Sequence, residues 1–254
     1  MDTVKILNGS RMALKAVIIL VMMVLLLLPM VKVNNLIDER MATQNDVKKE
    51  FEQKWGAPQT ISGPVLRIPY IDKTISQPNK DYIYIEPTSL AINGEVTPQL
   101  KHRGIYKMPV YSSDLHVSGQ FSLEEVLDLF AKNNMKPLWN ESHILSSMTD
   151  YTRLNNNVSC EIQNNTVKLK PKSQFDANGG FMLQGELQLE TTAPITFEYD
   201  IAFNGIQQLQ FNPKGQQIDI TLKGTWPDPS FIGERYTTNS KTAGGLFDAN
   251  WKFI

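Results

Sequence analysis

Few side chains in this sequence have the types and spacing that catalysis or metal binding needs. The chain has one cysteine, Cys160, and three histidines that lie far apart, His102, His116 and His143. A structural zinc site built on cysteines needs several thiolates, and a nucleophilic cysteine needs a neighbouring base. Cys160 follows Ser159 in a strand-like segment, so we interpret it as a buried thiol. We therefore predict no metal site.

Carboxylates offer little more. Asp150 and Arg153 stand three residues apart and could form a local ion pair or cap a turn, and Arg103 is an alternative partner for Asp150. General acid–base catalysis by carboxylates would call for a second, suitably spaced acid, which the spacing does not supply. The sequence has no glycine-rich phosphate loop, no G-x-S-x-G and no H-E-x-x-H. We expect no catalytic residues, no cofactor and no enzymatic activity.

An interaction surface is a better candidate than an active site. Pro227 and Pro229 fix φ and lack N–H donors, so the segment around them cannot be a central strand. Trp226 and Phe231 then stand on a rigid loop, which either packs on its own core or serves as a docking surface. We predict a candidate interaction surface made of this loop and a basic aromatic segment, with the residues Trp226, Pro227, Pro229, Phe231, Arg103 and Tyr106.

The elements that position these residues begin with an apolar segment. No charged residue occurs from Ala16 to Val31. A helix over residues 12–33 would be about 33 Å long, enough for a hydrocarbon core of about 30 Å, with Lys15 and Lys32 reaching the two interfaces. A cleaved signal peptide is the alternative, but the apolar run is long and no A-x-A-like site follows it. We predict a transmembrane helix, whose orientation the balanced Lys and Arg residues leave open.

A second helical pattern follows the apolar segment. Apolar residues recur at spacings of three and four from Ile37 to Trp55, and Gly56 and Pro58 end the pattern. The sequence predicts a stalk helix over residues 34–56. Packing of this helix on its own domain is favoured over a coiled-coil dimer stem, because barely three heptads are available.

Residues 57–254 carry strand signals at short, regular spacing, which predicts a mainly β (α+β) domain with a sandwich-like arrangement. Asn93-Gly94 and the segment 163–165 each predict a hairpin turn. Ser122 and Glu125 form a capping-box pattern that predicts one short internal helix. The charge balance, with 25 Lys+Arg against 26 Asp+Glu, argues against nucleic acid as a partner.

Several segments together resemble the CreD family of bacterial inner-membrane proteins. Trp55–Tyr70 is similar to W-G-x-x-Q-x-x-x-G-P-x-L-x-[IV]-P-Y, and Arg103–Tyr111 to R-G-I-Y-x-x-P-V-Y. Trp226–Gly233 is similar to W-P-x-P-S-F-x-G, and Ala249-Asn250-Trp251 to A-x-W. The motifs occur in the family's order and extend over nearly the whole chain.

The resemblance implies a cytoplasmic segment over residues 1–11, a first span at 12–33, the stalk, and a periplasmic domain over 57–254. It implies a role in cell-envelope integrity within a two-component regulon that responds to envelope or β-lactam stress. The expected partners are the lipid bilayer, the family's later C-terminal spans and envelope proteins. We expect this chain to lack those later spans. A transporter-like or channel-like protein is the alternative, and the resemblance supplies no catalytic residue.

Overall fold

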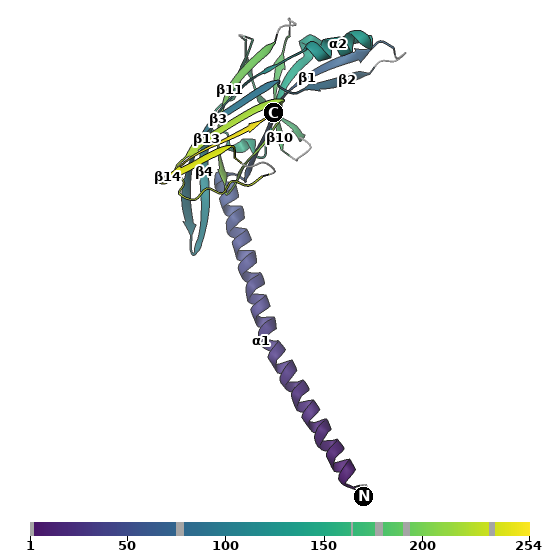
Figure 1. Cartoon of the computed structure of the whole chain (residues 1–254), viewed down its shortest axis with the longest axis vertical. Helices are drawn as coiled ribbons and strands as arrows, with labels where there is room; N and C mark the ends of the chain where they lie inside the picture. The colour runs from purple at the N-terminus through teal and green to yellow at the C-terminus, as the bar shows by residue number, and fades with distance from the viewer. Residues whose placement is uncertain (1–2, 75–78, 164, 176–179, 190–193, 234–236) are drawn as a thin grey trace. The chain divides into compact units, whose positions relative to one another are not determined.

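The computed structural model describes residues 3–74, 79–163, 165–175, 180–189, 194–233 and 237–254 (Figure 1). Contacts divide the chain into two units, residues 1–50 and 51–254, which we treat separately. The first unit consists of most of helix α1 (Thr3–Trp55), which contains Pro29. Within the described residues, none of the helices offers the long, uninterrupted apolar stretch that crossing a bilayer requires.

The second unit contains two β-sheets and few helical segments. The seven-stranded sheet, which we call sheet A, runs in the order β12 (Leu209–Pro213), β1 (Gln59–Asp72), β6 (Ser142–Met148), β10 (Phe181–Leu187) and β9 (Lys170–Phe175). Two further strands pair with the outer half of β1: β2 (Lys80–Ile85) and β5 (Met135–Pro137). The helical segments are α2 (Glu124–Lys132), η1 (Trp139–Glu141) and η2 (Tyr151–Arg153).

The eight-stranded sheet, sheet B, has the order β14 (Asn239–Ala243), β15 (Leu246–Phe253), β13 (Gln217–Gly224), β3 (Ser89–Arg103), β4 (Tyr106–Phe121), β11 (Ile195–Ile206), β7 (Ser159–Ile162) and β8 (Asn165–Lys168). Most neighbours are antiparallel, but β13 runs parallel to β3 and β12 runs parallel to β1. The prediction of a mainly β domain is confirmed.

One hydrophobic core lies between the two sheets. Along β11, alternate residues from Ile195 to Phe203 are buried, while those between them face away from the core. The rings of Phe121 and Phe197 lie 4.8 Å apart on neighbouring strands of sheet B. Leu66 and Ile144 contribute from sheet A and are fully buried. Both sheets therefore have one face directed into the core, as the alternating pattern predicts.

The predicted turn at Asn93-Gly94 is wrong. Both residues lie inside β3, where Gly94 is opposite Leu115 on β4 and opposite Leu222 on β13. A Cβ atom on Gly94 would lie 2.2 Å from Cδ2 of Leu115. The glycine is needed for this close approach between strands rather than for a turn. The hairpin turn is at Gly104-Ile105, between Arg103 and Tyr106.

Two other local predictions have mixed outcomes. The hairpin around residues 163–165 is confirmed, because β7 and β8 pair antiparallel, although residue 164 lies outside the described residues. The internal helix exists, but Ser122 is not its N-cap. Helix α2 begins at Glu124, whose N–H donates to Ser122 Oγ over a long 3.4 Å, and Leu123 occupies the cap position. Leu123 is buried in the core, which fixes the start of the helix one residue later.

The end of α1 is fixed to the sandwich by a small polar network. Gly56 has a φ of +99°, and a Cβ there would lie 2.6 Å from Cγ of Arg153. The Arg153 guanidinium donates to the backbone carbonyl of Gln53. Gln59, 1% exposed, accepts from the Asp150 amide at 3.1 Å and donates to the Asn204 carbonyl at 3.3 Å. Conformation and hydrogen bonding thus explain why glycine and glutamine occupy these two positions.

Candidate functional site

A two-stranded ribbon extends from one end of sheet B. β13 pairs with β3 only as far as Val96, and β11 pairs with β4 only from Val110 onward. Residues 97–109 therefore form a hairpin that pairs with no other strand among the described residues, which we call the ribbon, and its first arm, residues 97–103, is about 23 Å long. Figure 1 shows this hairpin extending beyond the other strands of the sheet. An isolated hairpin needs additional contacts for stability.

One face of the ribbon supplies these contacts. Residues directly opposite one another share a face, so Lys101 lies beside Met108. The Lys101 ammonium lies 5.0 Å from the centroid of the Trp55 ring, a cation–π contact with the last residue of α1. Met108 is buried. The predicted residues Arg103 and Tyr106 lie opposite each other on this same face, one exposed and one half-buried.

The other face of the ribbon and its turn are open to solvent. Leu100 and Lys107 lie on this face, where Leu100 is exposed, and Ile105 in the turn is 73% exposed. His102 is also exposed there. The ribbon therefore presents aliphatic groups beside cationic ones, a combination typical of contact surfaces.

The predicted loop around Trp226 lies beyond the same end of sheet B, because Gly224, the last residue of β13, pairs with Val96. Its aromatic rings point inward. The Phe231 ring lies 5.5 Å from that of Trp251 and 6.0 Å from that of Phe247. Trp226 is half-buried against the core. The exposed parts of the loop include Pro227 and, outside the predicted set, Ile232, which is 80% exposed.

We call this end of sheet B the junction end. It comprises the ribbon, the loop 225–233 and the turn between β14 and β15, where Leu246 is exposed. Exposed aliphatic side chains therefore stand on three separate turns at one end of the domain. The six predicted residues all lie at this end. The two aromatic rings of the loop pack against the domain, whereas the aliphatic side chains at the turns form the exposed surface.

The isolated titratable candidates have local partners. Asp150 Oδ1 accepts from the Thr152 backbone N–H at 3.0 Å, and its other oxygen lies 3.9 Å from Arg153 Nε, so both predicted roles of this pair are seen. His116 Nδ1 lies 2.8 Å from Asp200 Oδ1 at the surface. Burial raises the pKa of Cys160 to about 12. Across the described part of the chain, no three His, Cys, Asp or Glu residues are grouped to hold a metal ion.

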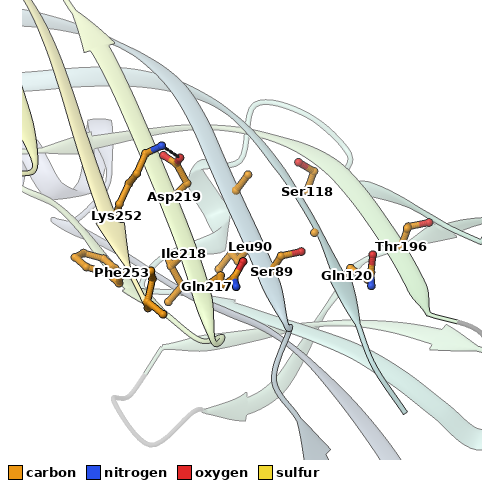
Figure 2. Close-up of a pocket in the computed structure, with 13 residues that line it drawn as sticks. Ser89, Leu90, Ser118, Gln120, Thr196, Gln217, Ile218, Asp219, Lys252 and Phe253 are labelled. Carbon is orange, nitrogen blue, oxygen red and sulfur yellow. Dashed lines mark ion pairs between the residues drawn. The ribbon is translucent and has the colours of Figure 1, made fainter. Parts of the chain in front are cut away.

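A shallow depression of about 560 Å³ lies across strand ends of sheet B (Figure 2). Small residues such as Ala91 and Gly119 are among those that line it. Asp219 and Lys252 are its charged residues, and Figure 2 shows them paired, with 2.9 Å between Oδ2 and Nζ. Burial raises the pKa of Asp219, but hydrogen bonds from Lys252 and Asn250 outweigh that effect and lower it. The lowered pKa of Asp219 makes this carboxylate a poor general acid or base near neutral pH.

Sequence reasoning missed one cluster on sheet A. Tyr84, Arg67, His143 and Glu186 lie directly opposite one another on β2, β1, β6 and β10. The alternation of Tyr82 and Tyr84 with isoleucines was a readable signal that both rings share one face of a strand. The pairing of that strand with Arg67 and His143 depends on long-range register, which the local sequence does not contain.

Comparisons with known proteins agree with the sequence motifs. Residues 11–254 match the family described as inner membrane protein CreD. The inner membrane protein CreD of Escherichia coli (strain K12) is 25% identical over 240 residues, covering 90% of this chain and 52% of that protein. The chain thus spans about half the length of this curated relative.

Among solved structures, a candidate protease from Parabacteroides distasonis ATCC 8503 aligns with 66% of this chain and 34% of its own. The sequence identity is 10% and the TM-score is 0.28, too low for any argument about fold or activity. The family match, in contrast, covers nearly the whole chain, including the ribbon and the loop 225–233 of the junction end. This chain belongs to the CreD family of inner membrane proteins.

Proposed function

We propose that this chain is a membrane-anchored, non-enzymatic domain that supports cell-envelope integrity through contacts made at its junction end. In this proposal residues 12–33 span the inner membrane, residues 1–11 are cytoplasmic and the β-sandwich lies in the periplasm. The observation that carries the proposal is the set of exposed aliphatic tips at one end of the domain, Leu100, Ile105, Ile232 and Leu246. Exposed apolar groups rimmed by charge are typical of protein or membrane contact sites.

The anchor is supported by the first unit. Apolar side chains from Leu14 to Leu26 in α1 are exposed, and a long run of exposed apolar side chains is stable in lipid rather than in water. The periplasmic side is an inference from the family, whose described members are inner membrane proteins. A role in envelope or β-lactam stress rests on the same family relation.

Cysteine labelling tests this topology, because the natural Cys160 is buried and serves as an internal control. The variant Ile105→Cys is expressed in cells whose outer membrane has been permeabilised, and a membrane-impermeant maleimide is added. We expect labelling at residue 105 in intact cells and labelling of a cysteine appended before Met1 only after lysis. Labelling of the N-terminal cysteine in intact cells, with protection of residue 105, would overturn the orientation.

Photo-crosslinking tests the contacts. A photoreactive amino acid at Ile105 or Ile232 in the full-length protein should give crosslinks, whereas the same group at Thr166, exposed on β8, should not. The paired substitution Leu100→Asp with Ile105→Asp should reduce complementation of envelope defects in cells, with Thr166→Asp as the matched control. Normal complementation by the paired variant would refute a role for the junction end.

A transporter-like or channel-like role is the second candidate function. It is favoured by one observation: the chain covers 52% of its E. coli relative, so about half of that protein lies outside the matched region. In this alternative, the sandwich gates or supplies the remaining part. Substrate-dependent flux in proteoliposomes that contain the full-length protein would support it, and crosslinks from Ile105 to the protein's own later segments would be expected.

A further inference from the structure

The cross-strand row on sheet A has the properties of a ligand site that is separate from the junction end. Arg67 lies opposite Tyr84 on one side and opposite His143 on the other, and His143 lies opposite Glu186. Directly opposite residues share a face of the sheet. The alternate residues Leu66 and Ile144 are fully buried in the core. The row therefore lies on the face of sheet A that is turned away from the core.

The two central side chains of this row are each buried at one nitrogen atom. Arg67 Nε and His143 Nδ1 have no hydrogen bond of normal geometry within the described part of the chain, although the Glu141 backbone lies near enough to the His143 ring to act on its pKa. Because solvent does not reach these two atoms, a ligand at this face would meet the other nitrogen atoms of the two side chains, Arg67 Nη1 and Nη2 and His143 Nε2. The guanidinium of Arg67 is well suited to a planar carboxylate, which accepts two parallel hydrogen bonds.

Two exposed tyrosines extend the row along strand β2. Tyr82 is 47% exposed and Tyr84 is 57% exposed, and their positions two residues apart put both rings on the face that carries Arg67. The Arg67 guanidinium carbon lies 5.0 Å from the centroid of the Tyr82 ring, which holds the cation beside the aromatic surface. The C–H faces of sugar rings stack on such flat, exposed aromatic rings, and the phenol groups can bond to sugar hydroxyls.

The surrounding charges limit how many anionic groups of a ligand this face can bind at once. Glu186 is exposed directly beside His143, and Lys80, at the start of β2, is paired with Glu141. The row offers one guanidinium next to an imidazole, and Lys172 on β9 is a further cation near enough to lower the pKa of His143. Its charge therefore fits one carboxylate per ligand unit, and its aromatic part fits the sugar that carries the carboxylate.

We propose that the face of sheet A formed by Tyr82, Tyr84, Arg67 and His143 binds an acidic saccharide, a glycan whose sugar units carry carboxylates. Arg67 and His143 bind the carboxylate, and the two tyrosines stack on sugar rings. This site is independent of the proposed contacts at the junction end, because it lies on the other sheet. Its test is a binding measurement on the purified protein, so it can fail without affecting the proposed function.

The test uses the full chain in detergent and isothermal titration calorimetry with three probes: hexagalacturonate, neutral chitohexaose and inorganic phosphate. We expect binding of the acidic hexasaccharide, binding of the neutral one at least ten-fold weaker, and no competition from equimolar phosphate. Equal affinity for both saccharides, no binding of either, or displacement of the acidic one by phosphate would each overturn the proposal. The last outcome would indicate a simple anion site.

Single substitutions test whether the saccharide binds at these residues. Arg67→Gln should weaken binding of the acidic hexasaccharide at least ten-fold and so reduce the difference in affinity between the acidic and the neutral saccharide. Tyr84→Leu should weaken the binding of both saccharides. Lys107→Gln and Tyr106→Leu, a cation and an aromatic ring on the ribbon, are the matched controls and should leave binding unchanged. Tyr84 is the safer substitution if Arg67→Gln impairs folding, because its ring is largely exposed. Unchanged binding by Tyr84→Leu would overturn the proposal.

Discussion

Replacing Gln59 with leucine should destabilise the domain through one small, buried hydrogen-bond network. The Gln59 side chain accepts from the Asp150 N–H and donates to the Asn204 carbonyl, and it is 1% exposed. Leucine has a similar volume, so little cavity forms. The substitution removes both hydrogen bonds from a place that water cannot easily reach.

The cost follows from the groups that remain. A buried donor or acceptor left without a partner costs about 1–3 kcal/mol. The Asp150 N–H loses its side-chain partner, whereas the Asn204 carbonyl has a second lone pair and tolerates the loss better. We therefore expect Gln59→Leu to lower the free energy of unfolding by about 1–3 kcal/mol.

Urea unfolding of the full chain, followed by tryptophan fluorescence, measures this change, because all four tryptophans lie within residues 51–254. Gln210→Leu is the matched control. Residue 210 is exposed and lies opposite Thr60 on the adjacent strand, so the free energy of unfolding should change by less than about 0.5 kcal/mol. Hydrogen exchange at the Asp150 amide should accelerate in Gln59→Leu. Equal stability of the two variants, with the amide still protected, would refute the reasoning.

Three further results are expected. Phe231→Ala should lower the free energy of unfolding by about 2–3 kcal/mol. It should also shift the fluorescence emission of Trp251, because the two rings are 5.5 Å apart. An unchanged emission spectrum would show that the loop does not pack on Trp251. Cys160 should react with a thiol reagent at pH 8 only after urea unfolding, and rapid labelling of the native chain would contradict its burial. Burial, together with the charge of Arg67, lowers the pKa of His143 in the folded protein. As the pH drops below about 6.5, the imidazole therefore binds a proton in the unfolded chain before it does so in the folded one, and the free energy of unfolding falls. His143→Gln should make the free energy of unfolding less dependent on pH in this range. Because one proton is involved and solvent screens the charges, the difference should stay below about 1.4 kcal/mol per pH unit. The same pH dependence of stability in both proteins between pH 5 and 7 would disprove the prediction.

The sequence contains enough local information to predict the class of fold. Alternation from Ile195 to Phe203 reports one buried face of β11, and the paired prolines correctly exclude the segment after Trp226 from a central strand. Asn93-Gly94 shows the limit of such local signals. The same dipeptide that favours a turn also suits a strand interior where Leu115 approaches too closely for any Cβ.

The candidate sites were predictable only in part. Arg103 and Tyr106 were singled out from a local motif, and they are indeed opposite each other at the base of a turn. The aliphatic character of the junction end was missed, because exposure of Ile105 and Ile232 depends on where the neighbouring strands stop. The contact between Arg67 and Tyr82 and the register of Arg67 with His143 join segments that lie far apart in the chain, and no periodicity reports such pairings.

The two parallel pairings have a consequence for the order in which the protein can fold. β3 has β13 as one neighbour, and β1 has β12, so strands near the start of the domain are completed by strands near its end. A nascent chain that stops before Leu209 leaves β1 and β3 with unpaired backbone edges, which are templates for aggregation. High contact order of this kind slows folding to milliseconds or longer, so the two sheets can be completed only after the second half of the domain has been made.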